Sequence, residues 1–134
     1  MFFNRARYIS KKIGLLDNYV KKWFVNIKQK LNNLEETNIE LAKQYLDDNR
    51  LDEAYTRLRI VHFLWPNNVE GTYFYALLLI FSEKKEKAIE ILNKVKSDEH
   101  IGKLLHIAKD YNSDYILDII KKNDTKLSDL KNVL

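Results

Sequence analysis

The first part of the chain follows a helical pattern of apolar and polar positions. Between residues 5 and 33, apolar residues recur at spacings of mostly three and four, and the lysines fall mostly outside this stripe. The pattern predicts one long amphipathic helix that ends near Asn32 and Asn33. Because the stripe is close to a heptad, pairing of two copies is one alternative. Its members are Ile9, Ile13, Leu16, Val20, Trp23, Ile27 and Leu34, and Tyr19, Phe24 and Leu31 widen it.

The rest of the chain predicts shorter helices separated by turn-forming residues. The pattern gives helices at about 35–48, 52–64, 69–82 and 86–96, and turns at 48–50, 65–68 and 83–85. Ser97-Asp98 is an N-cap signal for a further helix, and 114–122 would be its partner. Residues 124–134 are a short helix or a frayed tail. With only three Gly and one Pro, the chain is expected to be all-α.

Two of these helix pairs repeat each other at a fixed distance along the chain. Ala42 and Ala54 recur as Ala76 and Ala88, each with a large apolar or aromatic residue one turn away. A small residue on each helix lets two helices approach closely. Leu41-Ala42-x-x-Tyr45, Ala54-x-x-x-Leu58 and Pro66 form the first motif, and Tyr75-Ala76-x-x-Leu79 and Ala88-x-x-x-Leu92 form the second.

This pattern resembles the tetratricopeptide repeat (TPR) family, whose repeat of about 34 residues is a helical hairpin and whose usual work is holding another protein. The resemblance covers about residues 35–122. It departs from the family at the first-helix Trp position, which holds Asn38 and Thr72, and at the second closing Pro position, which holds His100. The family's Gly position holds Ala42 and Ala76, which are also small.

The resemblance gives an expected domain organisation. A basic amphipathic helix at 1–33 would precede TPR-like repeats at 34–123, and a short tail would follow at 124–134. The repeats would be 34–67, 68–97 and a degenerate third at 98–123. In the third, Ile107-Ala108-Lys109-Asp110-Tyr111 echoes the first motif, but Ile120 occupies the alanine position of its second helix. Such a terminal repeat would cap the array.

The resemblance also implies a binding groove lined by the first helix of each repeat. Residues 73–81 are apolar on every side, so something must cover the face that does not pack within the repeat. The cover could be the chain's own first or last helices, a partner segment, or a second copy. The side chains expected to bind a partner in this groove are Ile39, Lys43, Leu46, Tyr73, Leu77, Ile80 and Phe81.

The chemistry of this groove suggests the kind of partner. Some family members clamp a C-terminal carboxylate with Lys and Asn, but here the comparable positions hold Ile39, Lys43, Phe74 and Leu77, of which only Lys43 fits. An apolar groove is instead similar, at the level of fold, to the small TPR chaperones of bacterial secretion systems. The resemblance therefore implies an apolar partner segment.

The charge of the chain is distributed unevenly. The formal net charge is +4, yet residues 1–30 carry eight basic side chains and one acid, Asp17, for a net +7. This end could lie on an anionic membrane surface, pair with an acidic partner or pack as a solvated basic face. Nucleic acid is disfavoured because no recognition motif accompanies the charge. The basic surface comprises Lys11, Lys12, Lys21, Lys22, Lys28 and Lys30.

The sequence contains no signature of enzymatic chemistry. There is no phosphate loop or nucleophile motif, and His100 and His106 lack the i, i+4 spacing of a metal pair. No catalytic, metal or cofactor site is therefore expected. The absence of Cys favours an intracellular setting, and the longest apolar run, nine residues, is shorter than the roughly 20 that a membrane span needs. The basic N-terminus lacks the apolar core of a secretory signal, although an organelle transit peptide is an alternative.

These observations favour a cytoplasmic, non-enzymatic protein-interaction module, an adaptor or chaperone that holds an apolar partner segment. The alternative is a scaffold at a membrane surface, anchored by residues 1–30. The two can coexist if the basic helix anchors the chain and the repeats recruit a protein.

Overall fold

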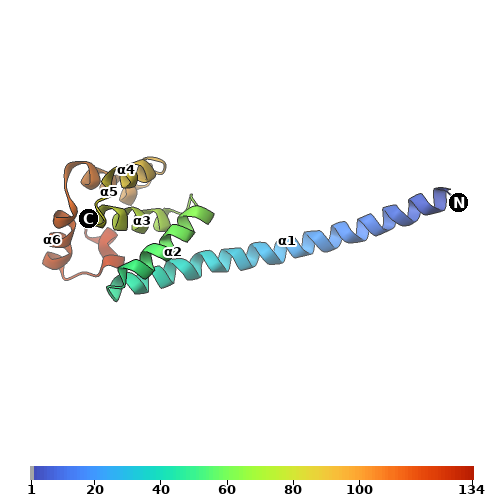
Figure 1. Ribbon diagram of the computed structural model, residues 1–134, viewed down its shortest axis with the longest axis horizontal. Helices are drawn as coiled ribbons and strands as arrows, with labels where there is room; N and C mark the ends of the chain where they lie inside the picture. Colours follow the sequence, from blue (N-terminus) through green and yellow to red (C-terminus); the bar gives the residue numbers. More distant parts are fainter. Residues whose placement is uncertain (1) are drawn as a thin grey trace. The chain divides into compact units, whose positions relative to one another are not determined.

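The structure, a computed structural model, describes the backbone of residues 2–134 and the side chains of residues 18–134. It is all-helical over this range, with helices α1 (Phe2–Asp47), α2 (Leu51–Leu64), α3 (Val69–Phe81), α4 (Lys85–Asn93), α5 (Glu99–Asp110) and α6 (Ser113–Asn123) and a 3-10 helix η1 (Leu127–Asn132) (Figure 1). The chain forms two compact units, Met1–Leu34 and Glu35–Leu134.

The first helix is longer than the sequence predicts. Two helices, 5–33 and about 35–48, were expected, but α1 runs without a break from Phe2 to Asp47. Asn32 and Asn33 do not interrupt it, because an Asn within a helix costs less than about 1 kcal/mol and keeps its backbone hydrogen bonds. A sharp stop would need Gly or Pro, and neither occurs between Gly14 and Pro66.

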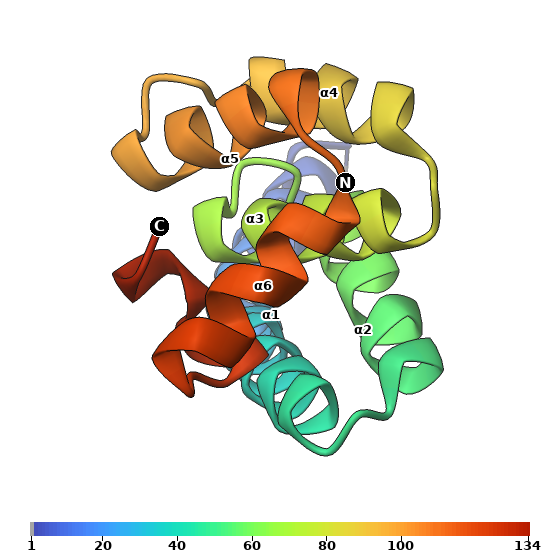
Figure 2. The same cartoon turned by 90° about the vertical axis from the view of Figure 1, so that its left-hand side faces the viewer.

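Helix α3 is the centre of the unit 35–134. Every residue from Gly71 to Ile80 is buried, and α3 packs against α2, α4 and α5. Figure 2 shows α3 with α4 and α5 on one side and α2 on another. The core that surrounds it continues into the last helices through Ile101, Leu104, Ile116 and Leu130. This explains why residues 73–81 are apolar all round: the chain's own helices cover this helix.

The turn between α1 and α2 and the turn between α3 and α4 have the same backbone hydrogen bonds at matching positions of the sequence repeat. The Arg50 N–H donates to the Tyr45 carbonyl at 2.8 Å, and the Lys84 N–H donates to the Leu79 carbonyl at 2.8 Å. Asn49 and Glu83 hold the matching left-handed conformations, with φ of 60° and 59°. Both turns are Schellman motifs, which satisfy the last carbonyls of a helix.

The small residues that define the sequence period lie in the core. Ala42, Ala54, Ala76 and Ala88 have no exposed surface. The expected N-cap also forms, because the Asp98 carboxylate accepts hydrogen bonds from the His100 and Ile101 amides at 3.0 and 3.1 Å. Helix α4 is shorter than predicted and ends at Asn93, beyond which residues 94–97 form a turn.

Candidate interaction surfaces

The side chains expected to form a binding groove mostly lie in the core. Ile39, Leu46, Tyr73, Leu77 and Ile80 are all at least 95% buried, so they do not present an open groove in this conformation. Phe81 is half-buried and packs against the core from its edge. A change such as Leu77→Glu would therefore disturb folding as well as any groove, because it would bury a charge.

Lys43, the one charged member of that set, is engaged within the fold. Its ammonium group pairs with the Glu70 carboxylate on α3 and with Glu40 at 3.5 Å. Burial alone would lower the pKa of Lys43, but the two carboxylates outweigh this effect and raise it. Lys43 thus joins α1 to α3, and a peptide carboxylate would have to compete with Glu70 for it.

Tyr73 borders a small cavity whose lining is mostly apolar. Its hydroxyl is buried without a hydrogen-bond partner among the described residues, and burial raises the pKa of this phenol. The cavity measures about 160 Å³ and lies at the N-terminal ends of α3 and α5, where His100 Nδ1 is also buried and unpaired. Two acids, Glu70 and Asp98, and one lysine, Lys131, line it.

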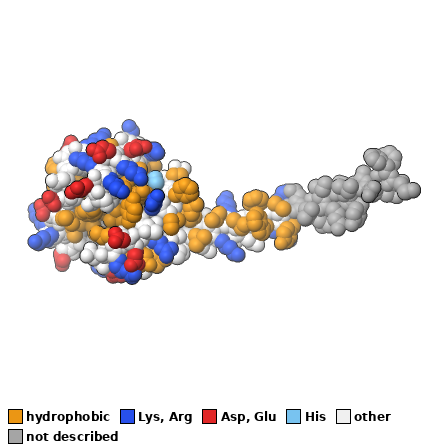
Figure 3. Space-filling view, in the orientation of Figure 1, with side chains coloured by type: hydrophobic (Ala, Val, Ile, Leu, Met, Phe, Trp, Pro, Cys, Tyr) orange, Lys and Arg blue, Asp and Glu red, His pale blue; other side chains and the backbone are white. Residues whose placement is uncertain are grey.

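Residues 18–34, whose side chains are the described ones of the first compact unit, carry an exposed apolar sector. At about 100° of rotation per residue, Val20, Trp23, Phe24, Ile27 and Leu31 fall within an arc of about 100°, and Tyr19 extends it to about 140°. Trp23 is 51% and Phe24 61% exposed, and their rings meet edge to face with centroids 5.4 Å apart. Apolar side chains therefore line this stretch of α1, between lysines (Figure 3).

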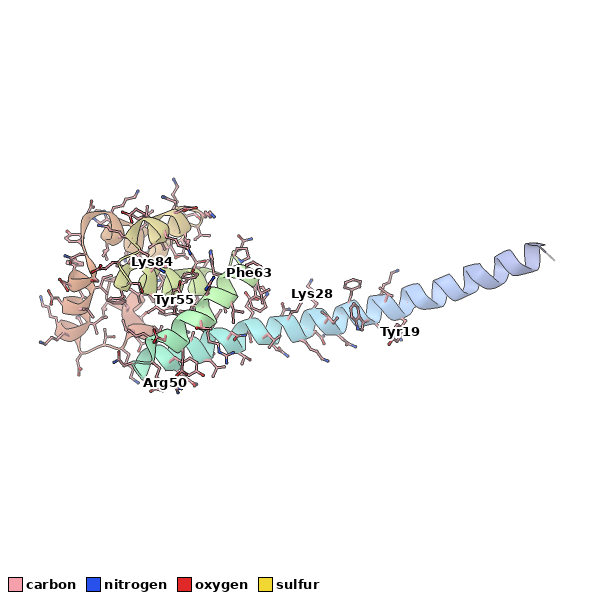
Figure 4. All side chains as sticks on the ribbon, viewed as in Figure 1. Tyr19, Lys28, Arg50, Tyr55, Phe63 and Lys84 are labelled. Atoms are coloured by element: carbon pink, nitrogen blue, oxygen red, sulfur yellow. The ribbon has the colours of Figure 1, made fainter. Side chains whose placement is uncertain are left out.

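The lysines of this stretch border the sector. On the same helical wheel, Lys28 falls beside Phe24 at one margin and Lys30 falls between Tyr19 and Trp23 at the other. Lys21 and Lys22 lie on the remaining face, and all four side chains are exposed. Figure 4 labels Tyr19 and Lys28 on this helix. Lys11 and Lys12, the other two cations of the predicted basic surface, lie outside the described side chains.

A second exposed apolar surface, which the sequence analysis missed, lies on the outer face of α2. Phe63 is 83% exposed, and its neighbours Ile60 and Leu64 are also exposed. These three side chains, together with Tyr55, Thr56 and Arg59, line an open groove of about 470 Å³. The sequence contained a signal for this surface. Helix α2 buries the face of Ala54, Leu58 and Val61. Ile60, Phe63 and Leu64 lie outside that face.

Tyr55 connects this groove to an aromatic and basic cluster. The Lys84 ammonium lies over the Tyr55 ring at 5.9 Å, and the Tyr75 ring meets Tyr55 edge to face at 5.7 Å. Tyr75 in turn contacts the His62 ring at 5.1 Å and lies under the Lys87 ammonium at 5.9 Å. Cations held over aromatic faces are attracted by about 0.5–1 kcal/mol at exposed sites.

The described side chains include no cluster that could hold a metal ion. No group of three or more His, Cys, Asp or Glu side chains comes together among residues whose side chains are described. His106 pairs with Asp110 at 2.9 Å on the surface. None of the helices in the described part of the chain combines the length and apolar character that crossing a bilayer needs.

Comparisons with models of protein families, with curated proteins and with solved structures found no match to this chain.

Proposed function

We propose that this protein is a non-enzymatic scaffold that binds an anionic membrane surface through residues 1–34. The observation that carries this proposal is the exposed sector of Tyr19, Val20, Trp23, Phe24 and Leu31, bordered by lysines. Amphipathic helices of this kind lie in the plane of a membrane, with the apolar face at the boundary between headgroups and acyl chains. Lysines at the margins can extend their ammonium groups to the headgroups.

The width of the sector favours a membrane over a coiled coil. A two-stranded coiled coil buries a narrow seam, whereas this sector spans about 140°. Tyr19 and Phe24 would remain at the edges of such a seam. In addition, Lys30 occupies the seam position between Ile27 and Leu34, and two helices of net charge +7 would repel each other. An anionic lipid surface can contact the whole width of the apolar sector and attracts the positive charge of the helix.

This segment can supply both contributions to the free energy of membrane binding, the electrostatic attraction and the burial of apolar side chains. Each Lys or Arg near an anionic surface contributes about 1 kcal/mol, and this attraction falls off within a Debye length of about 8 Å at physiological salt. A large apolar side chain contributes about 1.5–3 kcal/mol when it is fully buried. Residues 1–30 supply eight cations, and the described stretch supplies Trp23 and Phe24.

Sedimentation with lipid vesicles tests this proposal. We expect the full chain to sediment with vesicles of phosphatidylcholine and phosphatidylglycerol, but not with phosphatidylcholine alone, and to be released by salt. Replacing Lys11, Lys12, Lys21 and Lys22 by Glu should abolish binding. Trp23→Ser with Phe24→Ser should weaken it severalfold. Binding that is absent, or that salt does not affect, would exclude the proposal.

A matched control comes from the same stretch of helix. Val25 is 56% exposed but falls about 170° from the centre of the apolar sector. Val25→Ser should therefore leave vesicle binding unchanged. If Val25→Ser weakens binding as much as Trp23→Ser does, the helix does not bind through this sector.

We further infer that residues 35–123 form TPR-like hairpins that serve as a protein-interaction module. Support comes from the sequence period, which appears in the buried alanines and in the hydrogen bonds and left-handed residues of the two turns. The adaptor role would complement the membrane role, since the helix would anchor the chain and the hairpins would recruit a partner. Because five of the seven predicted groove side chains are at least 95% buried, we propose that the hairpins recruit a partner through a different, exposed surface.

A further inference from the structure

The groove on α2 runs between two parallel rows of side chains. Tyr55, Arg59 and Phe63 form one row at i, i+4 and i+8, and Thr56, Ile60 and Leu64 form the other. Rows of this spacing are the ridges of a helix surface, and the groove between two ridges accepts a ridge of a second helix. In the described part of the chain this face of α2 stays exposed, and Phe63 protrudes most.

A second hollow continues the groove beyond Tyr55. It measures about 340 Å³ and is lined by side chains from the start of α2 and from the end of α3, with Lys84 at its rim. Tyr55 lines both hollows, so together they form a track along α2 from Leu64 to Phe81. Figure 4 shows Tyr55 beside Lys84, with Phe63 at the opposite end of α2. Phe81 is thus the one predicted groove residue that lines this track.

The track has a positive rim. Arg59 lines the first hollow and Lys84 lines the second, while Asp52 is the single acid among the lining residues. Lys87 adds a third cation above Tyr75, which contacts Tyr55. The acid next to Asp52, Glu53, is paired with Arg50 at 2.5 Å.

We propose that this track binds an acidic amphipathic helix of another protein, with apolar side chains between the two rows of α2 and carboxylates against Arg59 and Lys84. The spacing of the rows selects a helix. The exposed ring of Phe63 and the neighbouring Ile60 and Leu64 provide the apolar contact. The cations steer the partner and fix its orientation.

A second copy of the chain fits this track poorly. Among the described residues, its longest run of exposed apolar side chains is the stretch 18–34 of α1, which carries Lys21, Lys22, Lys28 and Lys30 and no acid. Those lysines would face Arg59 and Lys84, and juxtaposed like charges oppose association. The sign of the charge therefore selects a different protein as the partner.

Selection from a display library tests the proposal. The probe is a library of random peptides of about 15 residues, long enough for four helical turns, selected on the full-length chain. We expect enriched peptides to combine apolar residues at spacings of three and four with Asp or Glu. Enrichment of basic or uncharged peptides, or no enrichment, would overturn the proposal.

Variants then locate the binding site of an enriched peptide by fluorescence anisotropy. Phe63→Ser should weaken binding by about tenfold or more, because one buried aromatic side chain is lost from the contact. Arg59→Glu should weaken binding severalfold, and Asp52→Asn should strengthen it. Leu117→Ser, at an exposed residue of α6, is the matched control and should have no effect. Equal effects of Phe63→Ser and Leu117→Ser would overturn the assignment.

Two further measurements separate this inference from its alternatives. Sedimentation equilibrium should show a monomer, and a dimer that Phe63→Ser dissociates would assign the track to a second copy instead. The inference rests on the adaptor role and not on membrane binding. Phe63→Ser should leave vesicle binding intact, and Trp23→Ser should leave peptide binding intact, so each proposal can fail alone.

Discussion

At the scale of single residues, the two repeated turns differ in how well their side chains suit the backbone. Asn49 and Glu83 both adopt φ near +60°, where a side chain with a Cβ is disfavoured. Asn tolerates this region because its short polar side chain bonds locally, but Glu lacks that compensation. Glu83 is therefore a strained position that a helix C-terminus would normally fill with Gly or Asn.

Replacing Glu83 by Gly should stabilise the protein. The change removes the cost of holding a residue with a Cβ in the left-handed conformation, roughly 1–2 kcal/mol. It also increases the conformational entropy of the unfolded chain, which opposes this gain by roughly 0.5–1 kcal/mol. We expect a net gain of about 0.5–1 kcal/mol in the free energy of unfolding, measured by urea denaturation. Asn49→Gly should gain less. A loss of stability in Glu83→Gly would contradict this account of the turn.

His62 gives the fold a dependence on pH. Burial first, and then the positive charges of Lys94 and Lys87, lower the pKa of His62 below its ordinary value of 6.5. The unfolded chain therefore takes up this proton more readily than the folded chain does. The contribution of His62 to stability is complete above pH 6.5 and is lost as the pH falls towards the lowered pKa.

The His62→Gln variant tests this dependence. The free energy of unfolding of the wild-type chain should fall more steeply than that of His62→Gln between neutral and mildly acidic pH. Lys94→Gln should also make the dependence shallower, because it removes one of the charges that lower the pKa. Equal slopes in the wild-type chain and His62→Gln would show that His62 does not titrate differently on folding.

At the scale of helices, two apolar residues that the sequence pattern does not distinguish differ in burial. Leu77 has no exposed surface in α3, whereas Phe63 in α2 is 83% exposed. Leu77→Ala should lower the free energy of unfolding by about 2–5 kcal/mol, since it opens a cavity in the core. Phe63→Ala should change it by less than about 0.5 kcal/mol. Similar losses in the two variants would contradict this assignment of core and surface.

The sequence pattern predicted the helices well where a strong local signal marked their ends. The turns at Asn49 and Glu83, the stop at Trp65 and the Asp98 cap all appear in the structure. The continuity of α1 was missed because Asn32 and Asn33 only weaken a helix, and the rest of the chain decides whether it breaks. The helix propensities of single residues could therefore not predict whether the helix continues through Asn32 and Asn33.

The interaction surfaces were harder to predict than the helices. Periodicity identifies an apolar face but does not say what covers it, and α3 lacks a polar face altogether. Part of its cover comes from α5, which follows later in the chain, and the same core also contains Ile116 and Leu130. Phe63 is the opposite case, an apolar side chain that stays uncovered. Only the arrangement of α2 to α4 reveals that nothing in the described unit packs over it.

At the scale of the whole molecule, the two compact units have different proposed tasks. Residues 1–34 would bind an anionic membrane surface, and residues 35–134 would hold a protein partner. The division of charge agrees with this arrangement, because residues 1–30 carry a net +7 while residues 31–134 carry a net −3. The net charge of the second unit therefore gives it less attraction to an anionic surface than residues 1–30 have, and its outer face of α2 would stay available to a partner.

The most direct test of the membrane role uses the fluorescence of Trp23. The chain has two Trp residues, so Trp65→Phe leaves Trp23 as the single reporter. Adding vesicles that contain phosphatidylglycerol should shift the Trp23 emission to shorter wavelength, because the ring leaves water for the membrane interface. Phosphatidylcholine vesicles should not produce this shift, and salt should reverse it. An emission spectrum that anionic vesicles leave unchanged would contradict the account.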